Sequence, residues 1–445
     1  MLCAINDITT SSEIQAPWEV FVEKNEETKK VTVTYISKRA TGSVQCPSCG
    51  GSVEIHDDYE AEFKDFPIDP DYRQTINLKY HRYKCKTCRK KFTEDISTIK
   101  YPRARLSHRS ALWIKKLLTA GLPISSLVKL SGIHWATVKK IYEDVMDEAL
   151  NKREKYVSET GYKPRYLAVD EFAIHKGHKY ATCVMDLDNG EIIWAGIGRS
   201  KEEFKAFFKD TDIEYLSKVK AVAMDMNASY NILFKEYLPQ AQIVYDRYHM
   251  QAQFGRDVLG VVRLDAAREH KKKANELKLE LSTTEDEDKR AELNKQIKEE
   301  NIEYRKVKKG RWPVLRNQDN LTEKQSEVLK DILDRHLDLA VCYALKEEMI
   351  ELFKLTDPKQ AKEGWEKWFK ACAESGIPAL IKFATNKEKN RMDGLVAHAT
   401  YHISTGKLEG MNNKIKVAKR IAYGYRDEEY FFKLIKYKSL SDLII

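Results

Sequence analysis

The sequence predicts a multidomain α/β protein in which a small β module and a group of helices precede a mixed sheet, and a long helical segment interrupts the domain of that sheet. Two apolar runs that end in carboxylates, Tyr166–Glu171 and Val219–Asp225, have the length and composition of buried strands. Two Cys-x-x-Cys pairs lie upstream of them. Between about residues 251 and 395 the chain is rich in Lys, Glu and Leu and lacks alternating apolar residues. These three patterns indicate separate structural parts.

Length and composition allow two to four domains with ordinary hydrophobic cores. The chain has 445 residues, 42% of them hydrophobic, and a formal net charge of +9. Residues 1–10 show no basic flank followed by an apolar core, and no run approaches the ~18 apolar residues of a membrane span. We therefore expect a soluble protein of the cytoplasm.

Four of the eight cysteines form two Cys-x-x-Cys pairs with 35 residues between them: Cys46, Cys49, Cys85 and Cys88. Alternating apolar residues before the second pair predict a β-hairpin that brings the two pairs together. Four thiolates in this arrangement suit a closed, tetrahedral structural zinc site. Two disulfides are the alternative, which the absence of an export signal disfavours. The remaining cysteines are expected to be packing residues.

The segment His81–Lys116 is strongly basic. It contains 12 Lys and Arg residues against only Glu94 and Asp95. Such a stretch is typical of a surface that meets a polyanion, with Arg103 and Arg105 as candidate phosphate contacts. An ordinary solvated surface is the alternative.

From Ser107 the apolar period changes to that of helices. The pattern predicts one helix that stops at Gly121, a second over Ile124–Ser131, a turn at Gly132, and a third from His134 to about residue 150. This layout is that of a helix-turn-helix, although a plain three-helix packing unit is also possible. The side chains expected to enter a DNA groove are His134, Trp135, Thr137, Lys139 and Lys140.

Residues 151–164 are polar and charged, and we expect a linker there. The sheet follows, with strands at Tyr166–Glu171, Lys179–Asp186, Glu191–Gly198, Val219–Asp225 and Ile243–Tyr245, and helices at Lys201–Lys209 and Tyr230–Tyr237. The turn Asp188-Asn189-Gly190 is a good hairpin signal. A mixed sheet of this order is what a ribonuclease-H-like domain shows.

Two of these strands end in an aspartate, Asp170 and Asp225. Either residue alone is most simply a polar side chain where a strand meets solvent. A pair on one rigid sheet suits Mg²⁺, which takes oxygen ligands and keeps positions open for phosphate and water. After the last strand, Asp246 and His249 are placed to lie near the same point at the start of a helix, although a lone histidine is usually structural.

The segment 251–395 is predicted to be an all-α insertion. Two long charged helices, Arg263–Leu281 and Glu285–Lys306, indicate an antiparallel pair, because no clean heptad is present. Thr284 is expected to cap the second of them, with Glu287 in the capping-box position. Thr322 is expected to cap a later helix, with Gln325 as its capping partner.

The last informative stretch surrounds Glu409. A helix that begins near Lys407 places Glu409, Asn412, Asn413 and Lys416 at i, i+3, i+4 and i+7, on one face. One acid surrounded by amides and a cation suggests a site, and a solvated amphipathic helix is the simpler alternative.

Taken together, these residues resemble the ISL-three family of bacterial insertion-sequence transposases, whose catalytic triad is Asp, Asp, Glu. The resemblance covers nearly the whole chain and is carried by CPSCGG with HRYKCKTCRKKFTE, by the helix-turn-helix, by LAVDEFAIHKGHKYATCVMDLDNGEIIWAGIGRS and by STGKLEGMNNKIKVAKRIAYGYRDEEYF. It implies that Asp170, Asp225 and Glu409 are the triad. The segment from Asp246 to His249 is similar to the D-R-F-H segment of the family, with Tyr248 in place of Phe.

The resemblance also implies an organisation and a reaction. The parts expected are a zinc-binding β module (1–100), a helix-turn-helix domain (104–150), a linker (151–164), a ribonuclease-H-like catalytic domain in two pieces (165–250 and 396–445) and the all-α insertion (251–395). The expected reaction is phosphoryl transfer on DNA with two Mg²⁺ or Mn²⁺ ions, beside a structural Zn²⁺. The expected partners are double-stranded DNA, as terminal inverted repeats and target, and a second copy of the chain in a dimer on DNA, at the bacterial nucleoid.

Two other functions fit parts of the sequence. A non-catalytic DNA-binding regulator derived from a transposase is expected to have lost a carboxylate, and none is missing here. A structure-specific nuclease on the same fold needs no helix-turn-helix and cuts without joining strands.

Overall fold

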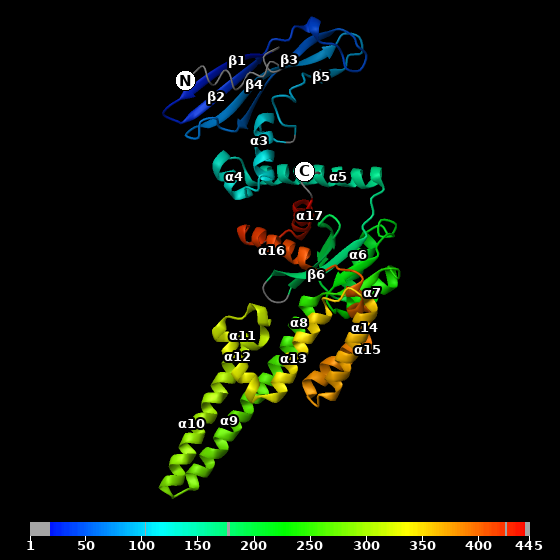
Figure 1. Cartoon of the computed structure of the whole chain (residues 1–445). Helices are drawn as coiled ribbons and strands as arrows, with labels where there is room; N and C mark the ends of the chain where they lie inside the picture. The colour runs from blue at the N-terminus through cyan, green and yellow to red at the C-terminus, as the bar shows by residue number, and fades with distance from the viewer. Residues whose placement is uncertain (1–17, 103, 176–178, 423–424, 441–445) are drawn as a thin grey trace. The chain divides into compact units, whose positions relative to one another are not determined.

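The computed structural model describes residues 18–102, 104–175, 179–422 and 425–440 (Figure 1). It divides into two compact units. The first holds the chain up to Lys152 together with residues 421–423, and the second holds residues 153–420 and 424–445. Each unit is built on its own sheet of five strands.

The sheet of the first unit follows from alternating apolar residues. Its strands are β1 (Trp18–Asn25), β2 (Lys30–Ser37), β3 (Val53–Asp65), β4 (Arg73–Cys85) and β5 (Lys91–Thr93), in the order β1-β2-β4-β3 with β5 beside β4. The β3–β4 pair is antiparallel and reaches from Val53 opposite Cys85 to Asp65 opposite Gln74. This long hairpin is the one predicted between the two cysteine pairs.

Three helices follow: α3 (His108–Thr119), α4 (Ile124–Ser131) and α5 (Trp135–Thr160). Ser107 caps α3 through its side chain, and Gly132 ends α4 in the left-handed region at φ 64°. The division between the two units, after Lys152, falls within the linker expected at 151–164, and α5 runs through it to Thr160. No glycine or proline interrupts the helix before Gly161, which has φ 63°.

The sheet of the second unit is mixed, in the order β10-β9-β6-β7-β8. The strands are β6 (Tyr166–His175), β7 (Lys179–Asp186), β8 (Glu191–Ile197), β9 (Ala221–Met224) and β10 (Gln242–Tyr245). β6 pairs in parallel with β9 only as far as Ala168, but it continues antiparallel to β7 beyond Glu171. Asp170 therefore lies within a strand, two residues past the end of the parallel pairing, whereas the sequence had suggested the end of the strand.

Helices cover both faces of this sheet because its strands alternate apolar side chains to either side. On one face, α6 (Lys201–Asp210) packs the rings of Phe204 and Phe207 against Trp194. Helix α7 (Ala228–Tyr237) adds Phe234, which contacts Phe204. On the other face, α16 (Gly406–Ile421) and α17 (Glu428–Ser439) bury side chains such as Met411 and Phe431. The sheet is thus the middle layer of three.

The chain between β10 and α16 is helical throughout, as predicted. Its elements are α8 (Arg247–Phe254), a π-helical turn (Gly255–Leu259), α9 (Gly260–Thr283), α10 (Glu287–Lys309), α11 (Arg311–Leu315), a 3₁₀ turn (Gln318–Asn320), α12 (Glu323–Arg335), α13 (Leu337–Leu352), α14 (Pro358–Glu374), α15 (Pro378–Val396) and a 3₁₀ turn (Ala397–Ala399). Thr322 caps α12 in a full capping box with Gln325, as expected. The expected cap of α10 is wrong: Asp286, not Thr284, accepts the hydrogen bond from Lys289 N.

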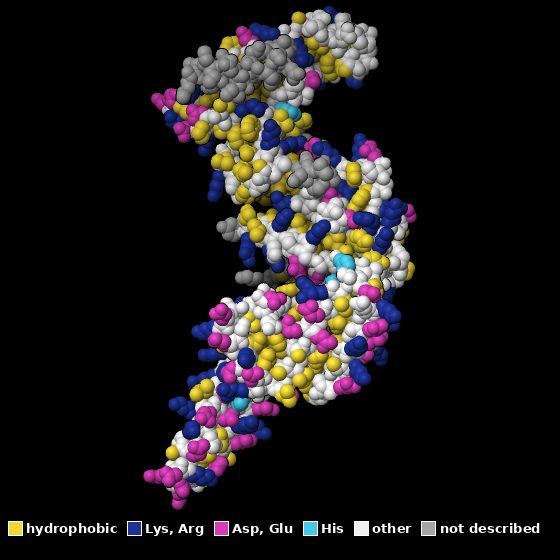
Figure 2. Space-filling model, viewed as in Figure 1, with side chains coloured by type: hydrophobic (Ala, Val, Ile, Leu, Met, Phe, Trp, Pro, Cys, Tyr) yellow, Lys and Arg dark blue, Asp and Glu magenta, His cyan; other side chains and the backbone are white. Residues whose placement is uncertain are grey.

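Charged side chains cover the antiparallel pair α9 and α10. Lys, Arg, Asp and Glu side chains are intermixed over these two helices, at the lower end of Figure 2. Several form ion pairs along or between helices, such as Lys289 with Glu280 at 2.9 Å. No helix among the described residues is long and apolar enough to cross a membrane.

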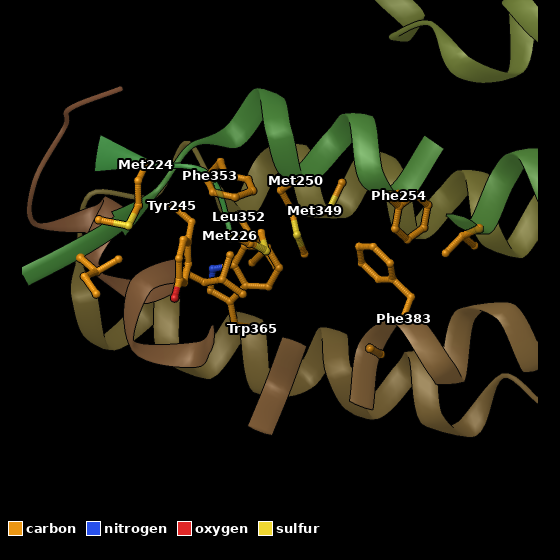
Figure 3. Close-up of a cluster of buried hydrophobic side chains, with 14 of the residues drawn as sticks. Met224, Met226, Tyr245, Met250, Phe254, Met349, Leu352, Phe353, Trp365 and Phe383 are labelled. Atoms are coloured by element: carbon orange, nitrogen blue, oxygen red, sulfur yellow. The ribbon is translucent and has the colours of Figure 1, made fainter. Parts of the chain in front are cut away.

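The helical segment does not form a body separate from the sheet. A single buried cluster contains Met224 and Tyr245 from the sheet together with Met349, Trp365 and Phe383 from the helices (Figure 3). Gly394 on α15 lies so close to the Tyr245 ring that an added Cβ would meet its Cε2 atom at 2.3 Å. The helical segment and the sheet therefore share one core.

Candidate active site and cysteine cluster

Three aspartates gather where the parallel strands of the second unit end. Asp225 directly follows β9 and Asp246 directly follows β10, while Asp170 lies just beyond the point where β6 leaves β9. Parallel neighbours bring their carboxyl ends to one edge of a sheet, so residues far apart in the chain meet there. The sequence prediction that Asp170 and Asp225 lie close together rests on this geometry.

Helix α16 carries Glu409 to the same place. Leu408, Met411 and Ile415 are buried against the sheet, and this apolar face fixes the rotation of the helix. Asn412 Nδ2 donates a hydrogen bond to Asp170 Oδ2 at 2.8 Å across 242 positions of sequence. At the far end of the helix, Lys419 Nζ donates to a carbonyl of β6 at 3.1 Å.

His249 lies between two of the predicted acids. Its Nε2 atom is 4.0 Å from Asp170 Oδ1 and 3.9 Å from Glu409 Oε1, so these two oxygens are at most about 8 Å apart. The same Nε2 is buried and has no hydrogen-bond partner among the described residues. A buried, unpaired ring nitrogen that faces two carboxylates indicates that a polar group or ion belongs between them.

The burial of these acids changes their protonation. Burial is the main cause that raises the pKa of Asp170 to about 6, and the carboxylates of Glu409 and Asp225 add to it against the opposing effect of His249. The pKa of Asp225 is also raised, chiefly by burial and then by Glu171. Holding several carboxylates together in a poorly solvated place costs free energy, which a bound cation relieves.

Asp246 belongs to the tightest group of potential ligands but is already engaged. Oxygen and nitrogen atoms of Asp246, His249 and Glu409 lie within 4.8 Å of one another. However, Asp246 Oδ1 accepts from the Tyr248 amide at 2.8 Å, and its Oδ2 accepts from Thr405 N at 3.0 Å. Asp246 thus caps α8 and ties it to the loop before α16, so it positions His249 and Glu409 instead of offering a free carboxylate.

The predicted face of α16 is only partly confirmed by the contacts. Asn412 is buried and reaches Asp170, whereas Asn413 and Lys416 are exposed. Within the described part of the chain neither of these two forms a hydrogen bond to the acids. Consecutive residues of a helix point in directions about 100° apart, so Asn412 faces Asp170 and Asn413 does not. The sequence spacing alone placed both residues on the same face.

Several neighbours of the site were not predicted. Glu171 accepts hydrogen bonds from Asn227 Nδ2 at 3.1 Å and from Tyr230 OH at 2.8 Å. Arg391 Nη2 donates to the carbonyl of Met226, the residue after Asp225, at 3.1 Å. The adjacency of Glu171 to Asp170 was a usable signal for the first of these contacts, but no local pattern identifies Arg391.

The four predicted cysteines of the first unit come together. Their sulfur atoms lie within 4.8 Å of one another, with Cys46 and Cys88 at 3.7 Å and Cys49 and Cys85 at 3.5 Å. Each pair forms the same tight turn, which ends in a residue with positive φ: Gly50 at 71° and Arg89 at 63°. The four donors surround one point, as a closed tetrahedral ion requires.

The protonation of these thiols supports the same conclusion. Backbone amides, that of Cys88 foremost, lower the pKa of Cys85 to about 6. The amide of Gly51 favours the thiolate of Cys49, but the thiols of Cys88 and Cys85 outweigh it and raise the pKa of Cys49 to about 11. The pKa of Cys46 is also lowered, mainly by the amide of Ser48. Because the pKa of Cys49 is raised, a full set of four thiolates needs a cation. Of the other cysteines, Cys183, Cys342 and Cys372 are buried, as expected, while Cys3 lies outside the described residues.

The candidate DNA contacts are distributed around α3 to α5. Arg105 and His134 are exposed, as is Trp135, which begins α5 with 51% of its surface accessible. Thr137 is half-buried, and Lys139 and Lys140 lie 3.5 Å from the Glu143 carboxylate. Arg103 lies outside the described residues.

Comparisons with known proteins agree with this arrangement. A family model described as "Transposase", that of the ISL-three group of DDE transposases, matches residues 167–435. The chain is 32% identical over 408 residues, 91% of either chain, to the transposase for insertion sequence element IS1001 of Bordetella parapertussis. It is 26% identical over 314 residues to the transposase for insertion sequence element IS1557 of Mycobacterium tuberculosis, a match that covers 70% of this chain and 67% of that relative.

Proposed function

Because this chain belongs to the ISL-three family of insertion-sequence transposases, we propose that it binds the terminal inverted repeats of its element, cleaves DNA strands there and joins them to target DNA. Asp170, Asp225 and Glu409 are the catalytic acids in this proposal. The reaction class is metal-dependent phosphoryl transfer without a covalent enzyme intermediate.

The docking of α16 is the observation that carries the proposal. The hydrogen bond from Asn412 to Asp170, and His249 between Asp170 and Glu409, join the first and third acids at one edge of the sheet. A helix with Glu409 turned to another face would leave a site of two acids. Burial raises the pKa values of Asp170 and Asp225, and carboxylates in such a place can serve a reaction at an anionic phosphate only if cations share the site.

The residues present fit a pair of divalent cations. Asp170, Asp225 and Glu409 would hold Mg²⁺ or Mn²⁺, since hard oxygen ligands suit these ions. Bound there, the ions would supply charge stabilisation for the attacking and leaving oxygens. The four thiols of Cys46, Cys49, Cys85 and Cys88 would hold one structural Zn²⁺.

The other side chains of the site orient these acids. Asn412 Nδ2 donates a hydrogen bond to one oxygen of Asp170. The Oδ1 atom of Asn412 is buried and accepts no hydrogen bond from any residue that the structure describes. Asp246 fixes the start of α8, and hence His249, by accepting backbone amides. The accessory roles of Asp246, His249 and Asn412 are therefore orientation, and Asn413 and Lys416, which are exposed, are left to contact DNA.

The rest of the chain is assigned by the same proposal. The sheet order with α16 across it supports a ribonuclease-H-like catalytic domain. The α4–Gly132–α5 arrangement supports a helix-turn-helix, and the cysteine module beside it supports a role in finding DNA ends. Trp135, with His134 and Thr137, would read bases, while Arg103 and Arg105 would contact phosphates. The working form is a dimer on double-stranded DNA in the bacterial cytoplasm.

A strand-transfer assay tests this function. Purified full-length protein is incubated with Mg²⁺ and a plasmid that carries the gene with its flanking DNA, and nicked, excised and joined products are separated on gels. The expected result is cleavage at the two element ends, with joining to a second DNA, and loss of both in Asp225→Asn. Cutting without joining would support the nuclease alternative, and binding without cutting by the wild type would support the regulator.

A further inference from the structure

A cleft between α7 and α15 lies on the second unit, outside the acidic site. It has a volume of about 500 Å³ and is lined by Ala228, Asn231, Ile232 and Lys235 from α7 and by Asn386, Lys387, Asn390 and Arg391 from α15. We propose that this α7–α15 cleft binds backbone phosphate of the DNA strand held at the acidic site. The inference rests on the proposed function and adds a second contact for the same strand.

The charge of the cleft is the first argument. Three cations and three carboxamides line it, and within the described residues no carboxylate does. The Lys387 ammonium is partly buried, and its pKa is lowered by burial and then by Arg391. Lys387 Nζ donates a hydrogen bond to Gln253 Oε1 at 2.7 Å, and Lys235 is exposed. Bringing three cations together with no acid in the lining raises the electrostatic free energy of the cleft, and a bound anion lowers it.

The cleft is also held in place beside the catalytic acids. Arg391 donates to the carbonyl of Met226 at 3.1 Å and to the hydroxyl of Tyr245 at 3.0 Å, so it spans the ends of β9 and β10. Asp225 and Asp246 are the neighbours of these two contact residues in the chain. Since α7 begins at Ala228, three residues after Asp225, the cleft adjoins the edge where the acids gather.

The lining selects a phosphodiester backbone over a base. Lys, Arg and Asn side chains are donors that suit phosphate oxygens, and no aromatic ring lines the cleft for a base to stack on. Ile232 is 48% exposed and offers an apolar surface of the kind that a sugar can cover. The contact would thus be independent of DNA sequence and would position the strand.

Photo-crosslinking tests the proposal directly. Full-length protein with Asp170→Asn, which holds DNA without cutting it, receives p-benzoylphenylalanine at Ile232 and is irradiated with labelled element-end DNA. Crosslinking is expected at Ile232, and Lys235→Gln with Lys387→Gln is expected to reduce its yield at least fivefold. The same photoreactive residue at Ile213 is the positional control. Ile213 is 50% exposed, and it lies in the chain before the first residue of β9, whereas the acids follow the last residues of the strands.

The charge control is Lys389→Gln, an exposed lysine of α15 that does not line the cleft. It should leave the Ile232 yield unchanged, and thermal unfolding should show that all variants fold. No crosslink at Ile232 with DNA bound would overturn the inference alone, whereas cleavage by Asp170→Asn would overturn the proposed function. Stabilisation of the wild type but not of the double lysine variant by inorganic phosphate, without any DNA crosslink, would assign the cleft to a small anion and reject DNA.

Discussion

The cysteine cluster of the first unit and the acidic site of the second unit assemble their ligands over very different distances in the chain. The cysteines come from two tight turns at the open end of one hairpin, one before β3 and one after β4. Each turn positions its own two sulfurs. The acids come from separate strands and from a helix that returns after the whole helical segment. The first site depends on local backbone geometry, and the second depends on the packing of the complete sheet.

The two sites also differ in how far their ligands are enclosed by the protein. In the cysteine cluster, backbone amides face the sulfurs, as with Thr87 N at 3.3 Å from Cys85 Sγ, and the four donors leave no open position for a substrate. In the acidic site, His249 Nε2 has no hydrogen-bond partner within the described part of the chain, and 41% of the Glu409 side chain is exposed. A closed site suits structure, and an open one suits chemistry. Removing a ligand should therefore cost stability in the first and activity in the second.

The largest effect is expected at the cysteines. Cys85→Ser, or removal of metal by a chelator, should unfold the end of the β3–β4 hairpin, because structural zinc contributes on the order of 10 kcal/mol of binding free energy to folding. Metal analysis should give one zinc per wild-type chain and much less than half an equivalent for the variant. Hydrogen exchange should rise in β3 to β5 and stay unchanged in β6 to β10. Equal exchange in β3 to β5 with and without metal would contradict a structural role.

The next effect is expected at Glu409. Glu409→Gln keeps the shape of the side chain and removes its charge, so strand cleavage should fall by about 10³-fold or more, or about 4 kcal/mol, while the unfolding temperature stays the same. Glu429→Gln is the matched control, since Glu429 is an exposed acid in the first turn of α17. If the Glu409 variant lost stability and kept its cleavage rate, Glu409 would serve the structure and not the reaction, as the cysteines do.

A smaller effect concerns pH in the metal-free protein. The native pKa of Asp170, about 6, lies above its ordinary value of 3.8, so the folded state binds this proton more tightly than the unfolded state. The stabilisation is present below pH 3.8 and is lost as the pH rises through about 6. Above that pH, Asp170→Asn should be more stable than the wild type by on the order of 2 kcal/mol.

Urea unfolding at pH 5 and pH 8 in the presence of a chelator measures this difference. Mg²⁺ should stabilise the wild type at pH 8 and have little effect on Asp170→Asn. If the two proteins differed in free energy of unfolding by the same amount at both pH values, the surroundings of Asp170 would not raise its pKa.

The parts predicted well from the sequence are those with short-range causes. The hairpin turn at Asp188–Gly190 and the capping box of Thr322 with Gln325 depend on residues within a few positions of one another. The same holds for Gly132, which ends α4 in a conformation that few other residues adopt. In each case the local chemistry leaves little choice.

The errors arose where two local signals competed or where distant packing decided. Thr284 and Asp286 both suit a helix cap, and the carboxylate accepts the amide. Residues 151–160 are polar enough for a linker, yet nothing in them breaks a helix. The contacts of His249, Arg391 and Asn412 depend on how whole helices pack against the sheet. The spacing of residues in the sequence does not determine that packing.

The core that the sheet shares with the helical segment limits how such a chain changes over time. Excising the segment would uncover Met224 and Tyr245, so the segment cannot be gained or lost as a unit without rebuilding the core of the second sheet (Figure 3). The exposed turn between α9 and α10, around Thr284, is different, because it contributes little to that core. Natural insertions, deletions and engineered fusions should be accepted at this tip and rejected on α13 to α15.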